Sequence, residues 1–168
     1  MDQVRRTELF SRCRARYAGY MAAVLWKLTG DRELFAEAMQ YAMLGLWQHV
    51  EQLEGDKATA YLYRIMLTAN SKAWRQRIGK DGRLARDPGV NEGPDHQIGR
   101  NESIAAVRQT ISRLPVKQAK AITMRYLEQR EYGDIAAALG CSEGGARSHV
   151  AKAVAALKRK LTILAEQR

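Results

Sequence analysis

The chain has 168 residues, enough for one ordinary domain or two small ones, and its 46% hydrophobic and 27% charged residues are typical of a folded protein. Its apolar runs are short or interrupted, and Arg5 and Arg6 are not followed by the apolar stretch of a secretory signal, so we expect a cytoplasmic protein without membrane insertion. The formal net charge of +10 favours nucleic acid as a partner, although a basic surface that only keeps the protein soluble explains the charge equally well.

Hydrophobic residues recur at helical spacing three times in the first half of the chain, and no strand pattern competes. The predicted helices run from about Thr7 to Leu28, from Asp31 to Leu53 and from Lys57 to Arg77. Their ends carry typical boundary residues, because Gly30 stops the first helix and Asp31 caps the second. Gly55 is predicted to end the second helix and Asp56 to cap the third.

Between Ile78 and Arg100 the periodicity stops, and the segment is rich in glycine, proline and mixed charge. This composition predicts a flexible linker over residues 78–100 that joins two small domains, residues 1–77 and residues 101–168. We therefore expect an all-α fold of two helical domains.

The second half begins with a predicted helix that Asn101 caps and that ends at Leu114, because Pro115 disfavours a helical residue before it. Three further helices are predicted, to about Leu127, from Tyr132 to Leu139, and from Ser142 toward Ala165. Gly140 and Cys141 form the turn before the last one. The segment from Tyr132 onward has the pattern of a helix-turn-helix.

The last helix separates its residues into two faces. The predicted buried stripe consists of Ala146, Val150, Ala153, Leu157 and Leu161. The outward face near the helix start carries Gly144, Arg147, Ser148, Ala151 and Lys152. Small residues and cations in these positions suit the major groove of DNA. A plain helical hairpin with a solvated face is the alternative.

Chemistry-bearing residues are sparse. Cys13 and Cys141 are far apart and outside any Cys/His cluster, so we expect two reduced, mostly buried thiols and no metal site. The histidines are scattered, and no nucleophile motif or phosphate-binding loop is present. We expect no enzyme activity and no cofactor.

Two segments resemble a known family. LPVKQAKAITMRYLEQREYGDIAAALGCSEGGARSHVAKAVAALKRKL resembles the fourth conserved region of bacterial sigma factors, which binds the −35 promoter element. ELFAEAMQYAMLGLWQHV and AYLYRIMLTANSKAWRQR are similar to the second conserved region. The resemblance covers nearly the whole chain apart from the linker, and the absence of another domain points to the extracytoplasmic-function group.

This resemblance implies the partners and the residues that bind them. Core RNA polymerase and promoter DNA are the implied partners, with an anti-sigma factor as inhibitor. The implied polymerase-binding residues are Glu37, Gln40, Leu44 and Trp47. The implied −10 contacts are Asn70, Ser71, Lys72, Arg75 and Arg77, and the implied −35 contacts are Ser142, Gly144, Arg147, Ser148 and Lys152.

Several of these residues have a structural alternative. Leu44 and Trp47 also fit a domain core, and Trp74 fits a core better than a base-stacking surface. Arg64 fits either an internal ion pair or a phosphate contact.

The chain also departs from the family pattern. Tyr41 replaces an acid, Lys72 replaces Asp, and Ala73 stands where an aromatic is frequent. Gly145 and Ala146 replace a Thr-Val pair, and Glu131 replaces the usual Ser cap. These departures affect surfaces that the resemblance assigns to polymerase and promoter.

Two other functions remain open. A helix-turn-helix regulator would bind an operator without core polymerase, and a helical adaptor would use its positive surface to bind an acidic protein. Transcription from a cognate promoter with core polymerase separates the sigma-factor interpretation from both.

Overall fold

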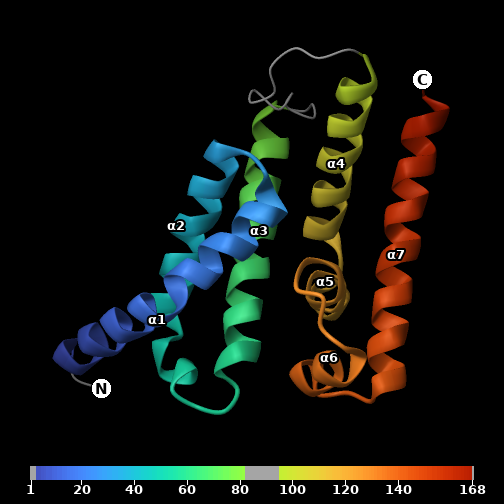
Figure 1. Ribbon diagram of the computed structural model, residues 1–168. Helices are drawn as coiled ribbons and strands as arrows, with labels where there is room; N and C mark the ends of the chain where they lie inside the picture. Colours follow the sequence, from blue (N-terminus) through green and yellow to red (C-terminus); the bar gives the residue numbers. More distant parts are fainter. Residues whose placement is uncertain (1–2, 82–94, 168) are drawn as a thin grey trace. The chain divides into compact units, whose positions relative to one another are not determined.

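The structure is a computed structural model that describes residues 3–81 and 95–167, with side chains for residues 3–79 and 102–167. Throughout the described residues the regular structure is helical and no strand occurs, which confirms the predicted all-α class (Figure 1). The chain divides into two compact units, Met1–Ala73 and Trp74–Arg168.

The first unit is built from α1 (Gln3–Thr29), α2 (Arg32–Gln48), a short 3₁₀ segment (Val50–Leu53) and the larger part of α3 (Ala58–Asp81). Figure 1 shows these helices in blue to green. The first two predicted boundaries are confirmed, since Gly30 has φ +65° and the Asp31 carboxylate accepts a 2.8 Å hydrogen bond from the Leu34 N–H.

The second predicted helix ends earlier than expected. The α-helix stops at Gln48 and the chain tightens, with the Gln52 N–H donating to the His49 carbonyl at 3.1 Å. The prediction of one α-helix to Leu53 is wrong here, because apolar residues spaced three or four positions apart fit both an α-helix and a 3₁₀-helix. Both Val50 and Leu53 are nevertheless buried, so the segment still contributes to the core.

Helix α2 packs against α1 and approaches α3 closely at a glycine. Its buried stripe consists of Leu34, Ala38, Ala42 and Leu46, and packs against α1. On the side of α3, a Cβ added to Gly45 would lie 2.9 Å from the Ile65 Cγ2 atom, so the two helices approach where a side chain is missing. Tyr20 and Tyr63 join α1 to α3 through ring centroids 6.2 Å apart.

The second unit contains α4 (Asp95–Arg113), α5 (Val116–Ile122), a π-helical turn (Thr123–Leu127), α6 (Tyr132–Leu139) and α7 (Glu143–Glu166). The long helix α7 packs against α4, α5 and α6. Figure 1 shows α6 and α7 joined at one end by a short turn, as the helix-turn-helix pattern predicts.

The helices on either side extend into the residues predicted to form the linker. Helix α3 continues to Asp81 and α4 begins at Asp95, so Asn101 lies inside α4 and does not cap it. A lone glycine such as Gly79 lowers helix stability by about 1 kcal/mol without ending the helix. Residues 82–94 lie outside the described residues.

Backbone hydrogen bonds and a left-handed glycine form the turns before and after α6. The Glu128 N–H donates a 3.3 Å hydrogen bond to the Thr123 carbonyl, five residues earlier. This bond makes the end of the helix that was predicted to reach about Leu127 π-helical. Gly140 closes α6 with φ +63°, and the Ser142 hydroxyl accepts a 3.1 Å bond from the Gly145 N–H. Both predicted boundary residues before α7 are thus confirmed.

The core of the second unit centres on α6 and the first half of α7. Its buried residues in these two helices are Ile135, Ala136, Leu139, Ala146, Val150 and Ala153. Leu157 and Leu161, which the sequence placed in the same stripe, are only half-buried. The buried part of α7 therefore ends at Ala153, about two turns earlier than predicted.

The thiols differ from each other. Cys13 is buried as predicted, and burial raises the pKa of its thiol, with Glu54 adding to the effect. Cys141 is only half-buried. Within residues 3–81 and 95–167, no helix is both long enough and apolar enough to cross a membrane.

Candidate functional site

The residues predicted to bind polymerase lie on the side of α2 opposite its buried stripe. These residues are Glu37, Gln40, Leu44 and Trp47. Gln40 is exposed, and Leu44 is 57% exposed. The alternative that Leu44 belongs to the core is therefore wrong, and the structure leaves an apolar side chain at the surface of α2.

Trp47 is half-buried because α1 braces its ring. The Phe10 ring meets it edge-on with centroids 5.3 Å apart, and the Arg6 guanidinium lies 5.2 Å from the ring centroid. Arg6 also donates a 3.2 Å hydrogen bond to the Trp47 carbonyl. These contacts join residues about forty positions apart, so no local sequence pattern predicts them.

A pocket of about 430 Å³ lies between α2 and α3 within the first unit. From α2 it is lined by Tyr41, Leu44, Gly45 and Gln48, and from α3 by Tyr61, Arg64, Thr68 and Lys72 among others. Its lining contains two cations and two tyrosines and no Asp or Glu. We refer to it as the α2–α3 pocket.

Two departures from the family pattern meet in this pocket. The Lys72 ammonium lies 4.2 Å from the centroid of the Tyr41 ring, within the range of a cation–π contact. Tyr41 lies on α2 and Lys72 lies on α3, so the sequence alone does not reveal their contact. In the structure they form one contact between an aromatic ring and a cation.

Asn70 is misplaced in the predicted −10 set. Its side chain is fully buried, so it does not face outward as a DNA contact would. The physical reason is the helical repeat of about 100° per residue. Asn70 lies two positions before the exposed Lys72 and therefore points to the other side of α3. Arg77 lies on the same side as Asn70 and is half-buried.

The exposed stripe of α3 consists of Arg64, Thr68, Lys72 and Arg75, at spacings of four, four and three residues. It includes two of the predicted contacts, and Ser71 lies beside it, half-buried. Arg64 is exposed at the pocket, while Trp74 is buried, as the core alternative predicted. Thr68 is the stripe residue that sequence analysis missed, although its spacing from Arg64 and Lys72 could have identified it.

All five residues predicted to contact the −35 element are exposed on α7 or at its cap. These residues are Ser142, Gly144, Arg147, Ser148 and Lys152. They lie opposite the buried residues Ala146, Val150 and Ala153. The structure therefore places together what the helical spacing predicted, next to the capped N-terminus of the helix.

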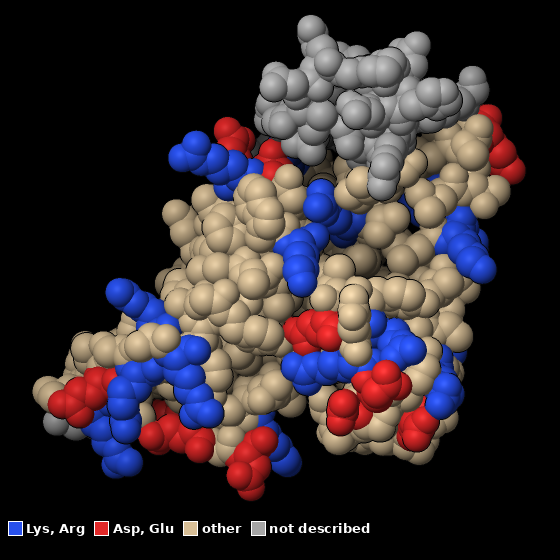
Figure 2. Space-filling view, in the orientation of Figure 1, with Lys and Arg blue, Asp and Glu red and all other residues tan. Residues whose placement is uncertain are grey.

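Acidic residues are interleaved with the cations of the second unit. Arg147 pairs with Glu143 at 2.6 Å, and Arg130 pairs with Glu128 at 2.6 Å. Figure 2 shows this mixture of blue and red over the lower part of the unit on the face in view. Cations of this unit therefore form local ion pairs with neighbouring acids.

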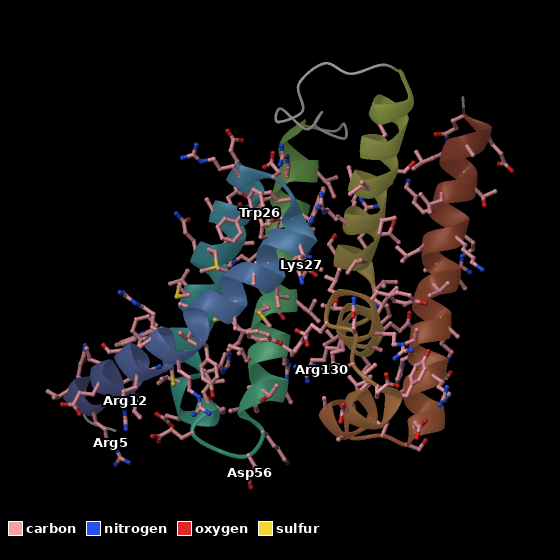
Figure 3. The ribbon with its side chains drawn as sticks, in the orientation of Figure 1. Arg5, Arg12, Trp26, Lys27, Asp56 and Arg130 are labelled. Atoms are coloured by element: carbon pink, nitrogen blue, oxygen red, sulfur yellow. The ribbon has the colours of Figure 1, made fainter. Side chains whose placement is uncertain are left out.

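A further group of cations, all of them arginines, lies on the N-terminal half of α1, where Figure 2 shows acidic side chains beside them. Figure 3 labels Arg5 and Arg12 there, and Arg12 lies 3.5 Å from Glu54 in the turn before α3. No role for these arginines as a surface was predicted from the sequence.

Comparison with known proteins gives two matches to family models. The model "Sigma-70 region 2" matches residues 14–78, and the model "Sigma-70, region 4" matches residues 104–157. Together these two ranges contain every residue of the predicted polymerase, −10 and −35 sets.

Curated relatives span most of the chain. The RNA polymerase sigma-H factor of Pseudomonas aeruginosa is 28% identical over 159 residues, which cover 87% of this chain and 82% of that protein. The RNA polymerase sigma-E factor of Streptomyces coelicolor is 31% identical over 120 residues, 70% of this chain and 64% of the relative. The ECF RNA polymerase sigma-E factor of Haemophilus influenzae is 26% identical, with coverage of 88% and 84%.

Proposed function

We propose that the two helical units of this chain bind different parts of the transcription machinery, because the chain belongs to the sigma-70 family. It is a sigma factor of the extracytoplasmic-function group and directs promoter-specific initiation of transcription. The first unit binds core RNA polymerase and the −10 element, and the second binds the −35 element. Sigma factors are initiation factors rather than catalysts, so the roles of individual residues are binding roles.

Polymerase docks on the exposed side of α2 in this proposal. An exposed leucine beside a braced tryptophan is the composition of an interface anchor, and Gln40 and Glu37 supply the polar rim. The bracing by Phe10 and Arg6 supports this role, because a ring that is already held in place loses little conformational entropy on binding.

The −10 element contacts the exposed stripe of α3 and the adjoining α2–α3 pocket. Single-stranded DNA is bound by cations along its backbone and by aromatic rings against its bases. Arg64, Lys72 and Arg75 provide the cations, and Tyr41 and Tyr61 provide the rings. Ser71 remains a predicted contact at the edge of this surface. Arg77 remains a predicted contact on the other side of α3, and the buried Asn70 is removed from the set.

The −35 element takes the exposed start of α7 into its major groove. The observation that carries the proposal is the co-location of Gly144, Arg147, Ser148 and Lys152 on the outer face of a helix whose N-terminus is capped by the fifth predicted residue, Ser142. Short side chains at Gly144 and Ser148 permit close approach, and Arg147 and Lys152 supply charge for base edges and phosphates.

The wider biology is also part of the proposal. The protein acts in the cytoplasm, where core polymerase and promoter DNA are its partners. Two modest DNA-binding units on one polymerase raise each other's effective concentration. An anti-sigma factor that covers the cationic surfaces of both units would hold the protein inactive.

The experiment that tests the division of roles is transcription in vitro with purified core polymerase and a genomic library. Arg147→Ala with Lys152→Ala should abolish initiation at the selected promoters while core binding stays at the wild-type level. Gln40→Ala with Leu44→Ala should weaken core binding at least tenfold, without the loss of bracing contacts that a Trp47 substitution would cause. Equal loss of both activities in both variants would reject the division, and binding of duplex DNA with full specificity in the absence of core would indicate an operator-binding regulator.

A further inference from the structure

One aromatic ring in the second unit is contacted by two guanidinium groups from different elements. The Arg125 Cζ atom, in the π-helical turn, lies 4.7 Å from the centroid of the Tyr132 ring. The Arg147 Cζ atom, in α7, lies 4.2 Å from the same centroid. These separations are those at which the face of an aromatic ring attracts a cation. Tyr132 therefore links the turn and the first helix of the helix-turn-helix to the outer face of α7.

The two arginines differ in how firmly they are held. Arg125 donates a 2.8 Å hydrogen bond to the Arg130 carbonyl and lies 3.5 Å from the Glu131 carboxylate. Its side chain is 31% exposed, whereas that of Arg147 is 59% exposed. Arg125 is thus part of the fold on which the ring rests, and Arg147 is the member that DNA can reach.

Arg147 is nevertheless restricted on both sides. Its Nη2 atom lies 2.6 Å from the Glu143 carboxylate, one turn earlier in α7, and its guanidinium lies against Tyr132. A free arginine loses rotamer entropy when it binds, so contacts that hold the guanidinium before binding reduce that loss. Hydrogen bonds to a guanine edge also require a fixed guanidinium plane.

We propose that Tyr132 is a positioning residue for Arg147, which it holds at the start of α7 in the orientation that contacts base edges of duplex DNA. This inference rests on the proposed −35 role of α7. Tyr132 itself needs no contact with a base. Its contribution is an orientation of Arg147 that the Arg147–Glu143 pair alone does not fix.

The test uses the full chain bound to core polymerase and a duplex that this wild-type complex selects from a library randomised over the upstream element. Tyr132→Leu should weaken binding of that duplex about fivefold, because the ring contact is lost. Tyr132→Phe should bind within about twofold of wild type, because the ring remains. Tyr126→Leu is the matched control, since Tyr126 is 61% exposed in the same unit and forms no cation–π contact with an arginine in the described part of the chain.

A double-mutant cycle separates positioning from a merely structural role. In the Arg147→Ala background, Tyr132→Leu should cause no further loss of affinity, because there is no guanidinium left to position. The base preference that Arg147→Ala removes should also be relaxed in Tyr132→Leu. A ring that acted only through the fold would weaken binding equally in both backgrounds.

Each outcome decides one of the two ideas. Wild-type affinity and base preference in Tyr132→Leu, with strong loss in Arg147→Ala, would overturn the positioning role and leave the −35 role intact. Equal losses in both backgrounds, or loss of binding in Tyr132→Phe, would also overturn it. Wild-type behaviour of Arg147→Ala itself would instead reject the proposed contact between α7 and the −35 element.

Discussion

Gly140 occupies a backbone conformation that other residues adopt only at a cost. Its φ of +63° and ψ of +44° let α6 end and turn toward α7. An added Cβ would meet nothing within 4 Å, so the penalty for Gly140→Ala comes from the backbone alone. We expect this substitution to destabilise the second unit by about 1–2 kcal/mol.

Gly133→Ala is the matched control for this prediction. Gly133 lies in the same helix α6, also has open space at its Cβ position, and has a negative φ. Alanine there should leave stability unchanged or raise it by up to about 1 kcal/mol. Native-state hydrogen exchange of α6 and α7 measures both effects within one unit of a two-unit chain. Equal stability of the two variants would contradict the backbone argument.

At the same scale, sequence patterns placed some residues correctly and others not. The five residues at the start of α7 follow from helical spacing and a single cap, both of which are local. The burial of Asn70 did not follow, because the residues around it alternate between apolar and polar in a way that fits more than one choice of outer face. The Tyr41–Lys72 contact joins two helices and depends on how they pack, which spacing along one helix does not reveal.

The approach of α2 to α3 depends on one missing side chain. A Cβ at Gly45 would lie 2.9 Å from the Cγ2 atom of Ile65, a buried and branched side chain with little freedom to move. Gly45→Ala should therefore separate the helices and destabilise the first unit by about 1–3 kcal/mol, despite the better helix propensity of alanine. Hydrogen exchange of α2 and α3 would measure the loss.

The control for this prediction lies in α1. Gly19 is exposed and helical, and an added Cβ would meet nothing within 4 Å, so Gly19→Ala should raise stability by up to about 1 kcal/mol. If Gly45→Ala also proved stabilising, the helices would have to be free to move apart at no cost. In that case the shape of the α2–α3 pocket would not depend on Gly45.

Whole elements were predictable where a residue type forces a boundary. Gly30, Asp31, Pro115, Gly140 and Ser142 mark such places, and the helices end or begin beside them. Boundaries without a forcing residue were misplaced. The start of α4 at Asp95 rather than at Asn101 is one case, because Asp and Asn are almost equally favoured near helix starts. The π-helical turn at Thr123–Leu127 is another, since an i to i+5 hydrogen bond leaves no periodic signature in five residues.

At the scale of the whole molecule, the net charge of +10 has two explanations, which the positions of the cations in the fold help to distinguish. One is a general basic surface, and the other is a set of cations placed on the two proposed DNA-binding surfaces. Several cations of the second unit are paired with acids, which reduces the general field and leaves specific positions as contacts. Salt dependence of promoter binding distinguishes the two, because each cation that neutralises a phosphate releases about one counterion.

We therefore expect Lys72→Gln to lower the slope of log affinity against log salt by about one for the polymerase-bound protein on its selected promoter. Arg147→Gln should lower it by less than one, because Arg147 is already neutralised by Glu143 at 2.6 Å before DNA binds. The double variant should show the sum, since the two residues belong to different units and share no partner. Arg32→Gln, which removes an exposed cation at the start of α2 outside both surfaces, should leave the slope unchanged. Equal slopes in Lys72→Gln, Arg147→Gln and Arg32→Gln would instead mean that the charge acts as a diffuse field and that neither surface makes the proposed phosphate contacts.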